Sequence, residues 1–229
     1  MNTLAWFDAI SGPSIVFPFI FTAKVASVTC VLHLSIGIIL AYYLSRRKSL
    51  LRDIIDIFVT LPLVFPPIAL GFMLLLILGK GGPIGQLLFD MLGVQIIFSF
   101  WGVVIASFIA GLPLIVKPVQ SAIQSTAGSL VEASYVLGKS EWQTFFYVVI
   151  PSVKKSIIGG LSLAFGRSIG EVGLTLMLGG NIVGKTNTLS LEIYNSVFTG
   201  EFDRALILTF ILGSASAIIF IILKKVATL

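Results

Sequence analysis

The chain contains 229 residues, of which 57% are hydrophobic and 11% are charged, with a formal net charge of +5. Soluble domains carry about 25% charged residues, so this composition excludes an ordinary soluble protein and indicates an integral membrane protein. The basic excess suits the cytoplasmic loops of such a protein, and we do not expect nucleic acid as a partner.

Five apolar segments are long enough to be membrane spans, since a transmembrane helix needs roughly 20 apolar residues. In chain order they cover residues 15–44, 54–78, 96–116, 152–178 and 205–223. The first segment lacks the preceding basic region of a secretory signal peptide, so we expect it to be retained as a helix. We predict an all-α integral membrane protein with one transmembrane domain over residues 1–229.

Lysine and arginine lie mainly in the segments that follow the first, third and fifth spans. That side of the membrane has ten basic residues: Arg46, Arg47, Lys48, Arg52, Lys117, Lys139, Lys154, Lys155, Lys224 and Lys225. The opposite side has three, Lys80, Lys185 and Arg204. Because basic residues accumulate in cytoplasmic loops, we predict an N-terminus outside and a C-terminus in the cytoplasm.

Proline interrupts the second and third apolar segments. Pro62, Pro66 and Pro67 lie in the second, within LPLVFPPIALG, and Pro113 lies in the third. Each proline removes a backbone donor and bends or breaks a helix, and the freed carbonyls need partners within the membrane. Two interpretations stay open: fixed kinks in a packed bundle, or hinges in helices that line a pathway.

Two charged residues lie inside the fourth span, in AFGRSIGEVG. Arg167 and Glu171 are four residues apart, so on a helix they share a face and can pair, and nearby Gly173 allows another helix to approach. A charge in the membrane interior is costly and is usually paired or functional. The pair can fix helix packing, line a hydrophilic pathway, or lie in water near the outer interface.

Other polar groups in the apolar segments are isolated. Lys24 lies where it can extend to the outer headgroups, and His33, the single histidine, is more typical of a packing residue than of a proton relay. The single cysteine, Cys30, excludes an intrachain disulfide. The sequence has no metal-ligand spacing and no GxxxxGK[ST] motif for a nucleotide. We expect no metal site, no catalytic site and no enzyme activity in this chain.

Residues 117–151 form a long half-polar segment on the predicted cytoplasmic side. Apolar and charged residues alternate in it with an approximately helical period. Gly138 suits a helix end, and Pro151 suits the start of the next helix. We expect a helix, a turn and a second helix near the membrane surface. Their apolar residues need cover, either from a partner protein or from other loops of this chain.

The same segment carries a recognisable motif. Glu132-Ala133-Ser134, Gly138 and Pro151 reproduce the spacing E-A-A, three residues, G, nine residues, I-x-L-P, with Ser134 in place of the second alanine. By this motif the chain resembles the membrane subunits of ATP-binding-cassette (ABC) importers. The stretches LPLVFPPIALGFMLLLILGKGGPIG and GRSIGEVGLTLMLGGNIVGKTNTLSLEIYNSV are similar to the molybdate branch of that family.

The resemblance implies a type I importer fold in the inner, cytoplasmic membrane. Two copies would form the pore, two ABC ATPase subunits that carry ATP and magnesium would dock on the cytoplasmic side, and a periplasmic or surface-anchored binding protein would deliver the oxyanion. The chain itself would hold no cofactor. The ATPase-coupling residues implied are Glu132, Ala133, Ser134, Leu137, Gly138 and Pro151.

Molybdate is a dianion and cannot enter hydrocarbon without water or hydrogen-bond donors. We expect a route lined by small polar residues and the ion pair: Arg167, Glu171, Gly173, Thr175 and Asn181. Two alternatives stay open, namely a sulfate or tungstate permease of the same family, and a proton-coupled secondary transporter that uses Glu171 or His33. Such secondary transporters often contain internal inverted repeats, and none is visible in the sequence.

Overall fold

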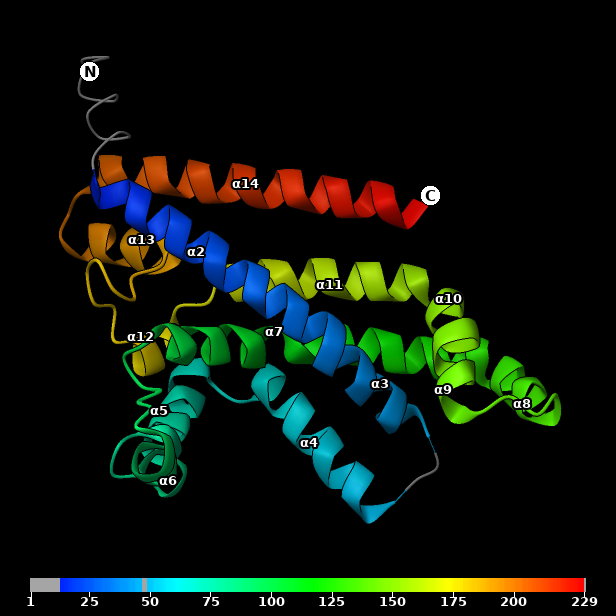
Figure 1. Ribbon diagram of the computed structural model, residues 1–229. Helices are drawn as coiled ribbons and strands as arrows, with labels where there is room; N and C mark the ends of the chain where they lie inside the picture. Colours follow the sequence, from blue (N-terminus) through cyan, green and yellow to red (C-terminus); the bar gives the residue numbers. More distant parts are fainter. Residues whose placement is uncertain (1–12, 47–48, 229) are drawn as a thin grey trace.

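The computed structural model describes residues 13–46 and 49–228, and the regular elements within them are all helices (Figure 1). The first membrane helix consists of α2 (Pro13–Leu32), the π-helical η1 (His33–Gly37) and α3 (Ile38–Ser45). It agrees closely with the predicted span 15–44. The predicted all-α class is confirmed for the described residues.

The predicted second span is two helices rather than one. The region contains α4 (Leu50–Val64), α5 (Pro67–Leu78) and α6 (Pro83–Leu92). Phe65, between α4 and α5, has an extended backbone with φ −82° and ψ 140°, as the residue before a proline usually does. The prolines were expected to bend or break the helix here, and Pro66 and Pro67 break it completely. Pro62, in contrast, lies inside α4.

The long helix α7 (Phe100–Ala122) begins and ends later than the predicted third span, 96–116. Pro113 lies inside it without breaking it. The chain then stays mostly helical through η2 (Ile123–Ala127), α8 (Gly128–Val136), α9 (Glu141–Thr144), η3 (Phe145–Val149), α10 (Ile150–Ser152) and α11 (Lys154–Ile169). The segment 117–151 is thus helix, turn and helix, as predicted, but its first residues belong to α7.

The predicted fourth span is also broken. α11 ends at Ile169, and α12 (Gly173–Gly179) begins after the irregular residues 170–172, so one helix over 152–178 is wrong. A bend of 74° separates Glu141–Ser152 from Lys154–Ile169. The remaining elements are α13 (Leu189–Phe198), which the sequence analysis did not predict, and α14 (Phe202–Thr228).

Three helices are long and apolar enough to cross a membrane, and up to five spans result if each of two bent helix pairs is one span. The three are Ile15–Ser45, Phe100–Ser125 and Phe202–Val226. In Figure 1 the start of α2 lies beside α13 at one end of the bundle, whereas α8 and α9 lie at the other end. The C-terminal end of α14 points toward the α8–α9 end.

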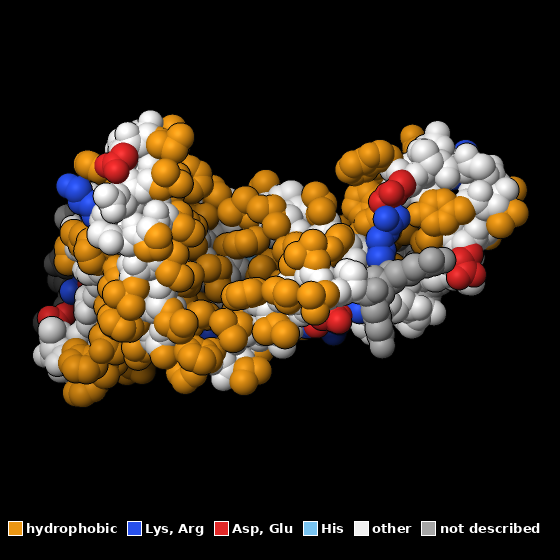
Figure 2. All heavy atoms as spheres, turned by 90° about the horizontal axis from the view of Figure 1, so that it is seen from below, with side chains coloured by type: hydrophobic (Ala, Val, Ile, Leu, Met, Phe, Trp, Pro, Cys, Tyr) orange, Lys and Arg blue, Asp and Glu red, His pale blue; other side chains and the backbone are white. Residues whose placement is uncertain are grey.

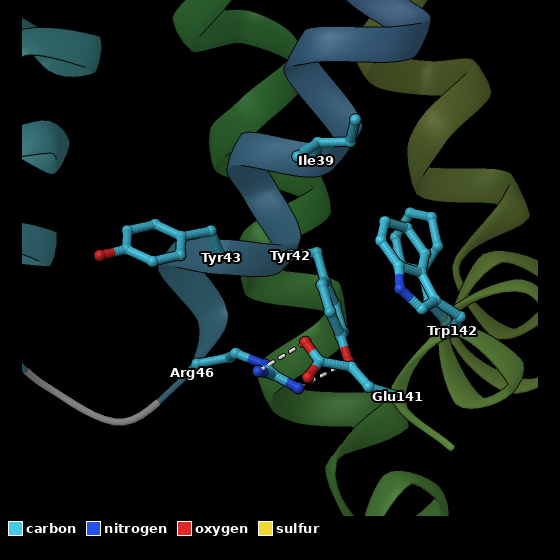
Figure 3. A pocket seen from close by; sticks show the side chains of 7 residues that line it. Ile39, Tyr42, Tyr43, Arg46, Glu141 and Trp142 are labelled. Atoms are coloured by element: carbon cyan, nitrogen blue, oxygen red, sulfur yellow. Dashed lines mark hydrogen bonds and ion pairs between the residues drawn. The ribbon is translucent and has the colours of Figure 1, made fainter. Parts of the chain in front are cut away.

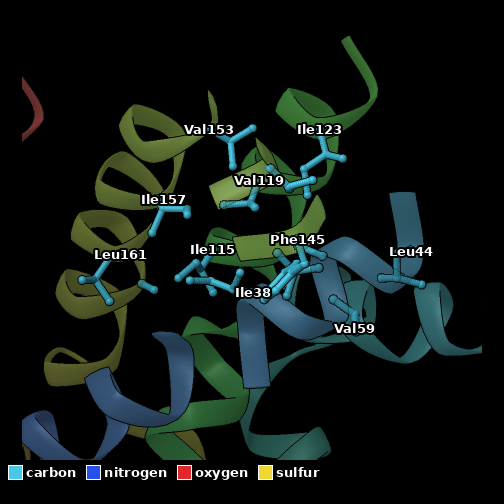
Figure 4. Close-up of a cluster of buried hydrophobic side chains, with 14 residues drawn as sticks. Ile38, Leu44, Val59, Ile115, Val119, Ile123, Phe145, Val153, Ile157 and Leu161 are labelled. Carbon is cyan, nitrogen blue, oxygen red and sulfur yellow. The ribbon is translucent and has the colours of Figure 1, made fainter. Parts of the chain in front are cut away.

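The largest buried cluster lies around the second half of α7 (Figure 4). Side chains from α3, α4, η3 and α11 surround Ile115, Val116 and Val119, which are fully buried. A Cβ atom at Gly160 of α11 would lie 3.1 Å from Ile115 Cα. Since this contact is to backbone, α11 and α7 approach as closely as small residues allow in membrane bundles.

Much of the surface is apolar. Figure 2 shows that hydrophobic side chains cover most of the face to which α4, α5 and α6 contribute, with few charged side chains among them. In the apolar part of α14, only 11% of the residues are buried. Such a surface is stable in lipid or against other apolar helices.

Candidate functional site: the α8–α9 hairpin and the helix break at Glu171

The α8–α9 hairpin, residues 128–144, is a compact unit that projects from the end of the bundle (Figure 1). Gly138 in its turn has φ +74°, a left-handed conformation that glycine adopts without strain. The turn is closed by hydrogen bonds from Gly138 N to Tyr135 O (3.0 Å) and from Lys139 N to Ser134 O (3.0 Å). Gly138 thus ends α8, as the sequence predicts.

Hydroxyl and amide side chains fix the second half of the hairpin. Ser140 starts α9 with a capping box, in which Gln143 N donates to Ser140 Oγ (3.3 Å) and Ser140 N donates to Gln143 Oε1 (3.0 Å). The buried hydroxyls of Ser134 and Thr144 lie 2.8 Å apart and join α8 to α9. Ser134 in the alanine position of the motif therefore adds a cross-link that alanine cannot make.

The hairpin exposes large apolar side chains. Val136 is 87% exposed, Leu137 78% and Trp142 68%. Leu137 is one of the six residues expected to contact an ATPase. Of the remaining five, Ser134 is buried and the others, Glu132, Ala133, Gly138 and Pro151, are exposed. In the described structure the apolar side chains are therefore not covered by other loops of this chain, which was the alternative left open by the sequence.

Arg46, at the end of α3, connects the first membrane helix to both halves of the hairpin, and Figure 3 shows its contact with Glu141 of α9. Its guanidinium lies 2.7 Å from Glu141 Oε1 and donates to the hydroxyls of Tyr42 and Tyr135 at 3.0 Å each. Arg46, Tyr42 and Glu141 border a pocket of about 170 Å³ that Trp142 also lines. Desolvation lowers the pKa of Arg46, but its bonds to Tyr42 and Glu141 outweigh this, so the pKa lies above the ordinary value and the group stays charged.

Arg167 and Glu171 form the predicted ion pair, but not on one continuous helix. Glu171 lies in the break after α11, where its Oε1 accepts a hydrogen bond from Leu174 N (2.8 Å). The carboxylate thereby caps the start of α12, where negative charge is favourable. Glu171 is 2% exposed as a residue, whereas the Arg167 side chain is 34% exposed. The acid faces the protein interior, and the guanidinium reaches toward the surface.

The two helix breaks meet at Gly173. A Cβ atom there would lie 3.0 Å from Pro67 Cβ, so α12 begins directly against the start of α5. Thr175, 1% exposed, donates through Oγ1 to Glu171 O (2.7 Å) and stabilises the same break. Pro66 and Pro67 therefore position α5 for contact with α12.

Hydroxyl groups also satisfy backbone groups near this break. Ser168 Oγ donates to Ser107 O and Ser190 Oγ donates to Ile169 O, each at 2.8 Å, and Leu189 N donates to Thr22 Oγ1 (2.9 Å). They line, with Glu171, a cavity of only about 10 Å³. A tetrahedral oxyanion does not fit in that space.

The loop 180–188, at the end of the bundle away from the hairpin, is held by amide and hydroxyl side chains. Asn181, in a left-handed conformation with φ 49°, donates to Asn195 Oδ1 (2.8 Å). Buried Thr186 bonds to Gly179 O (2.7 Å), and Asn187 Oδ1 accepts from Gly184 N (3.0 Å). The loop links α12 to α13 as a fixed structure.

Like the Arg46–Glu141 pair, two further ion pairs were not predicted from the sequence. Lys117 Nζ lies 2.7 Å from Asp56 Oδ1, which joins α7 to α4, and Arg204 pairs with the largely buried Glu192 of α13. The partners lie on different helices, 61 residues apart in the first pair and 12 in the second, so no spacing along one helix signals them. His33 fulfils the expected packing role, because its buried ring stacks on Phe108 and its Nε2 lies 3.0 Å from Phe108 O.

Lys24 is exposed on α2, and Cys30 is a free cysteine. Within residues 13–46 and 49–228, no group of three or more His, Cys, Asp or Glu side chains is placed to hold a metal ion.

The described chain is a helical bundle with helices apolar enough to span a membrane and with an exposed, internally cross-linked hairpin. A family model of binding-protein-dependent transport system inner membrane components matches residues 33–227, and the chain belongs to this family. It is 40% identical over 185 residues to the molybdenum transport system permease protein ModB of Azotobacter vinelandii, covering 80% of this chain and 81% of the relative.

A sulfate transport permease is less similar. The sulfate transport system permease protein CysT of Escherichia coli K12 is 29% identical, covering 89% of this chain and 72% of the relative. The fold also matches that of a bacterial alginate ABC transporter solved in complex with an alginate pentasaccharide-bound periplasmic protein. The TM-score is 0.73 at 16% identity, covering 99% of this chain and 81% of that chain. The multi-pass helical permease fold is thereby confirmed.

Proposed function

We propose that this chain is the pore-forming permease subunit of an ATP-driven importer for molybdate in the inner, cytoplasmic membrane. The observation that carries the proposal is the exposed α8–α9 hairpin with the Glu132-to-Pro151 motif, in a chain 40% identical to a molybdenum permease. ATP and magnesium belong to a separate ABC ATPase in this proposal.

The hairpin is the docking element for that ATPase. Its exposed Val136 and Leu137 offer an apolar contact, and exposed Glu132 offers a charge beside it. The turn at Gly138, the Ser140 cap and the Ser134–Thr144 bond let it move as one rigid unit. A rigid docking element transmits a displacement, as rigid-body switches require.

The anion pathway lies between two copies of the chain. The interior near Glu171 has a cavity of only about 10 Å³, so the described part of a single chain offers no passage there. The Arg167 side chain, 34% exposed, extends from this region toward the surface and carries the positive charge that attracts an anion. Arg167, Gly173, Thr175 and Asn181 stay assigned to the pathway as predictions, with Glu171 balancing the charge of Arg167.

Molybdate is preferred to sulfate as cargo because the molybdenum permease is 40% identical and the sulfate permease 29%. Tungstate is the alternative cargo that the competition experiment below tests. In this proposal a binding protein outside the membrane selects the anion and delivers it. The family and the alginate transporter, solved with its periplasmic protein, support such a partner.

The test is reconstitution of the chain with its ATPase in vesicles that hold ATP. We expect radiolabelled molybdate to accumulate only when ATP and the loaded binding protein are both supplied, with two permease chains per complex by mass measurement. Excess sulfate should compete weakly. Accumulation without nucleotide, driven by a proton gradient, would instead identify a secondary transporter, and stronger competition by sulfate or tungstate would reassign the cargo.

A further inference from the structure

The α8–α9 hairpin is joined covalently to the bundle through two π-helical segments. η2 (Ile123–Ala127) precedes α8, and η3 (Phe145–Val149) follows α9. Short π-helical segments in a helix are uncommon and frequently lie at functional sites. Both covalent links therefore depart from a regular helix at the point where the hairpin begins or ends.

Arg46 provides a noncovalent link from a different helix. It contacts Tyr135 of α8 and Glu141 of α9, so one guanidinium holds both halves of the hairpin. The planar guanidinium group has donors in a fixed geometry and stays charged, which suits it to fix the position of several acceptors at once. Tyr42, one turn earlier on α3, accepts a further bond from Arg46 and orients it.

The end of α3 that carries Arg46 is itself fixed. The carbonyl of Leu44 accepts hydrogen bonds from Arg52 Nε (2.6 Å) in α4 and from Gln120 Nε2 (3.2 Å) in α7. Leu44 is fully buried in the largest apolar cluster. Arg46 therefore extends from a rigid base, and a displacement of the hairpin acts on the whole end of the first membrane helix.

The same helix reaches the opposite end of the bundle. It runs as a 31-residue apolar helix over Ile15–Ser45. Near its other end, Thr22 Oγ1 accepts a hydrogen bond from Leu189 N at the start of α13 (2.9 Å). One long helix thus contacts the hairpin through Arg46 at one end and α13 through Thr22 near the other end.

We propose that Arg46 is a positioning residue for transport, which ties the α8–α9 hairpin to the first membrane helix so that movement of the hairpin is transmitted to the far end of the bundle. This inference rests on the proposed function, since it concerns the hairpin as the ATPase-docking element. It adds a route through α2, η1 and α3 to the covalent routes through α7 and α11.

The exposure of the ion pair makes the inference testable. The Arg46 and Glu141 side chains are 40% and 57% exposed, and ion pairs this exposed contribute little to folding stability. Substitution is therefore expected to change the position of the hairpin without preventing folding or assembly. The effect should appear in coupling, the number of anions transported per ATP hydrolysed.

The experiment compares vesicles that contain the complete complex with wild-type chain, R46M, R46E, or R46E combined with E141R. For R46M we expect anions transported per ATP to fall about threefold, because loss of one exposed ion pair changes the ratio of docked to displaced hairpin positions by about that factor. R46E should fall further because two acids then face each other, and the charge exchange should recover at least half of the loss. K155Q, which removes an exposed charge at the start of α11, is the matched control and should stay at the wild-type ratio.

Each outcome decides the question. Recovery by the charge exchange, with normal subunit content in every variant, supports the positioning role, because the loss of coupling then follows the ion pair and not the folding or assembly of the chain. Wild-type ratios in both R46M and R46E, with normal subunit content, would overturn it, as would an exchange variant no better than R46E. Failure of the proposed function is distinguishable from failure of this inference, because the wild-type vesicles themselves would then lack ATP-dependent uptake.

Discussion

Glu171 has two partners in the structure, a guanidinium and a backbone amide. Its carboxylate pairs with Arg167 and also caps the first turn of α12 by accepting from Leu174 N. An uncompensated charge in this setting is costly, and an uncapped helix start leaves donors without partners. Both tasks depend on the chain being broken between Ile169 and Gly173.

Removing the carboxylate should destabilise the protein. For Glu171→Ala we expect the free energy of unfolding to fall by about 2 kcal/mol, because the cap and the partner of Arg167 are lost together. Thermal unfolding of the purified protein in detergent measures this. The double variant with Arg167→Met and Glu171→Gln keeps an acceptor for Leu174 N and leaves no unpaired charge, so its stability should be near wild type.

The same double variant separates stability from transport. If Arg167 attracts the anion, uptake should fall severalfold although the protein is stable. Unchanged uptake in reconstituted vesicles would remove Arg167 and Glu171 from the pathway and leave them a structural pair. Asp90→Asn, an exposed acid on α6, is the control for loss of a carboxylate.

At the scale of elements, the turn of the α8–α9 hairpin depends on one backbone angle. Gly138 has φ +74°, whereas proline is held near −65°. We expect Gly138→Pro to abolish ATP hydrolysis that is coupled to transport while the chain still inserts into the membrane. Gly138→Asn should retain most activity, because asparagine tolerates the left-handed region.

The control for this prediction is Gly159→Ala in α11, where an added Cβ meets no atom within 4 Å. ATPase activity stimulated by loaded binding protein, and membrane content of the chain, are the two measurements. A Gly138→Pro complex that assembles normally and stays fully coupled would contradict the assigned role of the hairpin.

The two helix breaks differ in how well the local sequence predicts them. Pro66 and Pro67 predict a kink or hinge, and the structure has a complete break there, since two consecutive prolines remove two donors. The break at 170–172 was missed, because AFGRSIGEVG contains no proline and its apolar character is continuous. The break places Gly173 against Pro67, over a hundred residues earlier in the chain, and local sequence does not signal such a contact.

At the scale of the whole molecule, basic residues predict which end of the bundle faces the cytoplasm. After replacement of Cys30 by serine, a single cysteine at Lys139 should react with a membrane-impermeant maleimide only from the cytoplasmic side. A cysteine at Val183, which is 79% exposed in the loop before α13, should react only from outside. The opposite pattern would reverse the orientation and place the hairpin where no ATPase can reach it.

Composition and the spaced motif were sufficient to predict the class, the first membrane helix, and the helix, turn and helix of the hairpin. Pairing between distant elements was not predictable, because the Lys117–Asp56 and Arg46–Glu141 pairs join helices with no common spacing. Thr175 was predicted as a pathway residue, and that role stays a prediction. Its hydroxyl donates to a backbone carbonyl, as do those of Ser168 and Ser190, and these bonds were not predictable because they depend on where the chain breaks.

Those hydroxyl-to-carbonyl bonds set a limit on redesign of the anion preference. Ser190 Oγ donates to the carbonyl of Ile169 at the end of α11, so alanine at position 190 leaves a buried acceptor without this bond. Ser168 Oγ bonds to the carbonyl of Ser107, so alanine at position 168 removes a contact between α11 and α7. A mutant library aimed at new cargo would lose many of its members to misfolding if it varied these two serines. Randomising the exposed face beside Arg167 leaves that scaffold untouched.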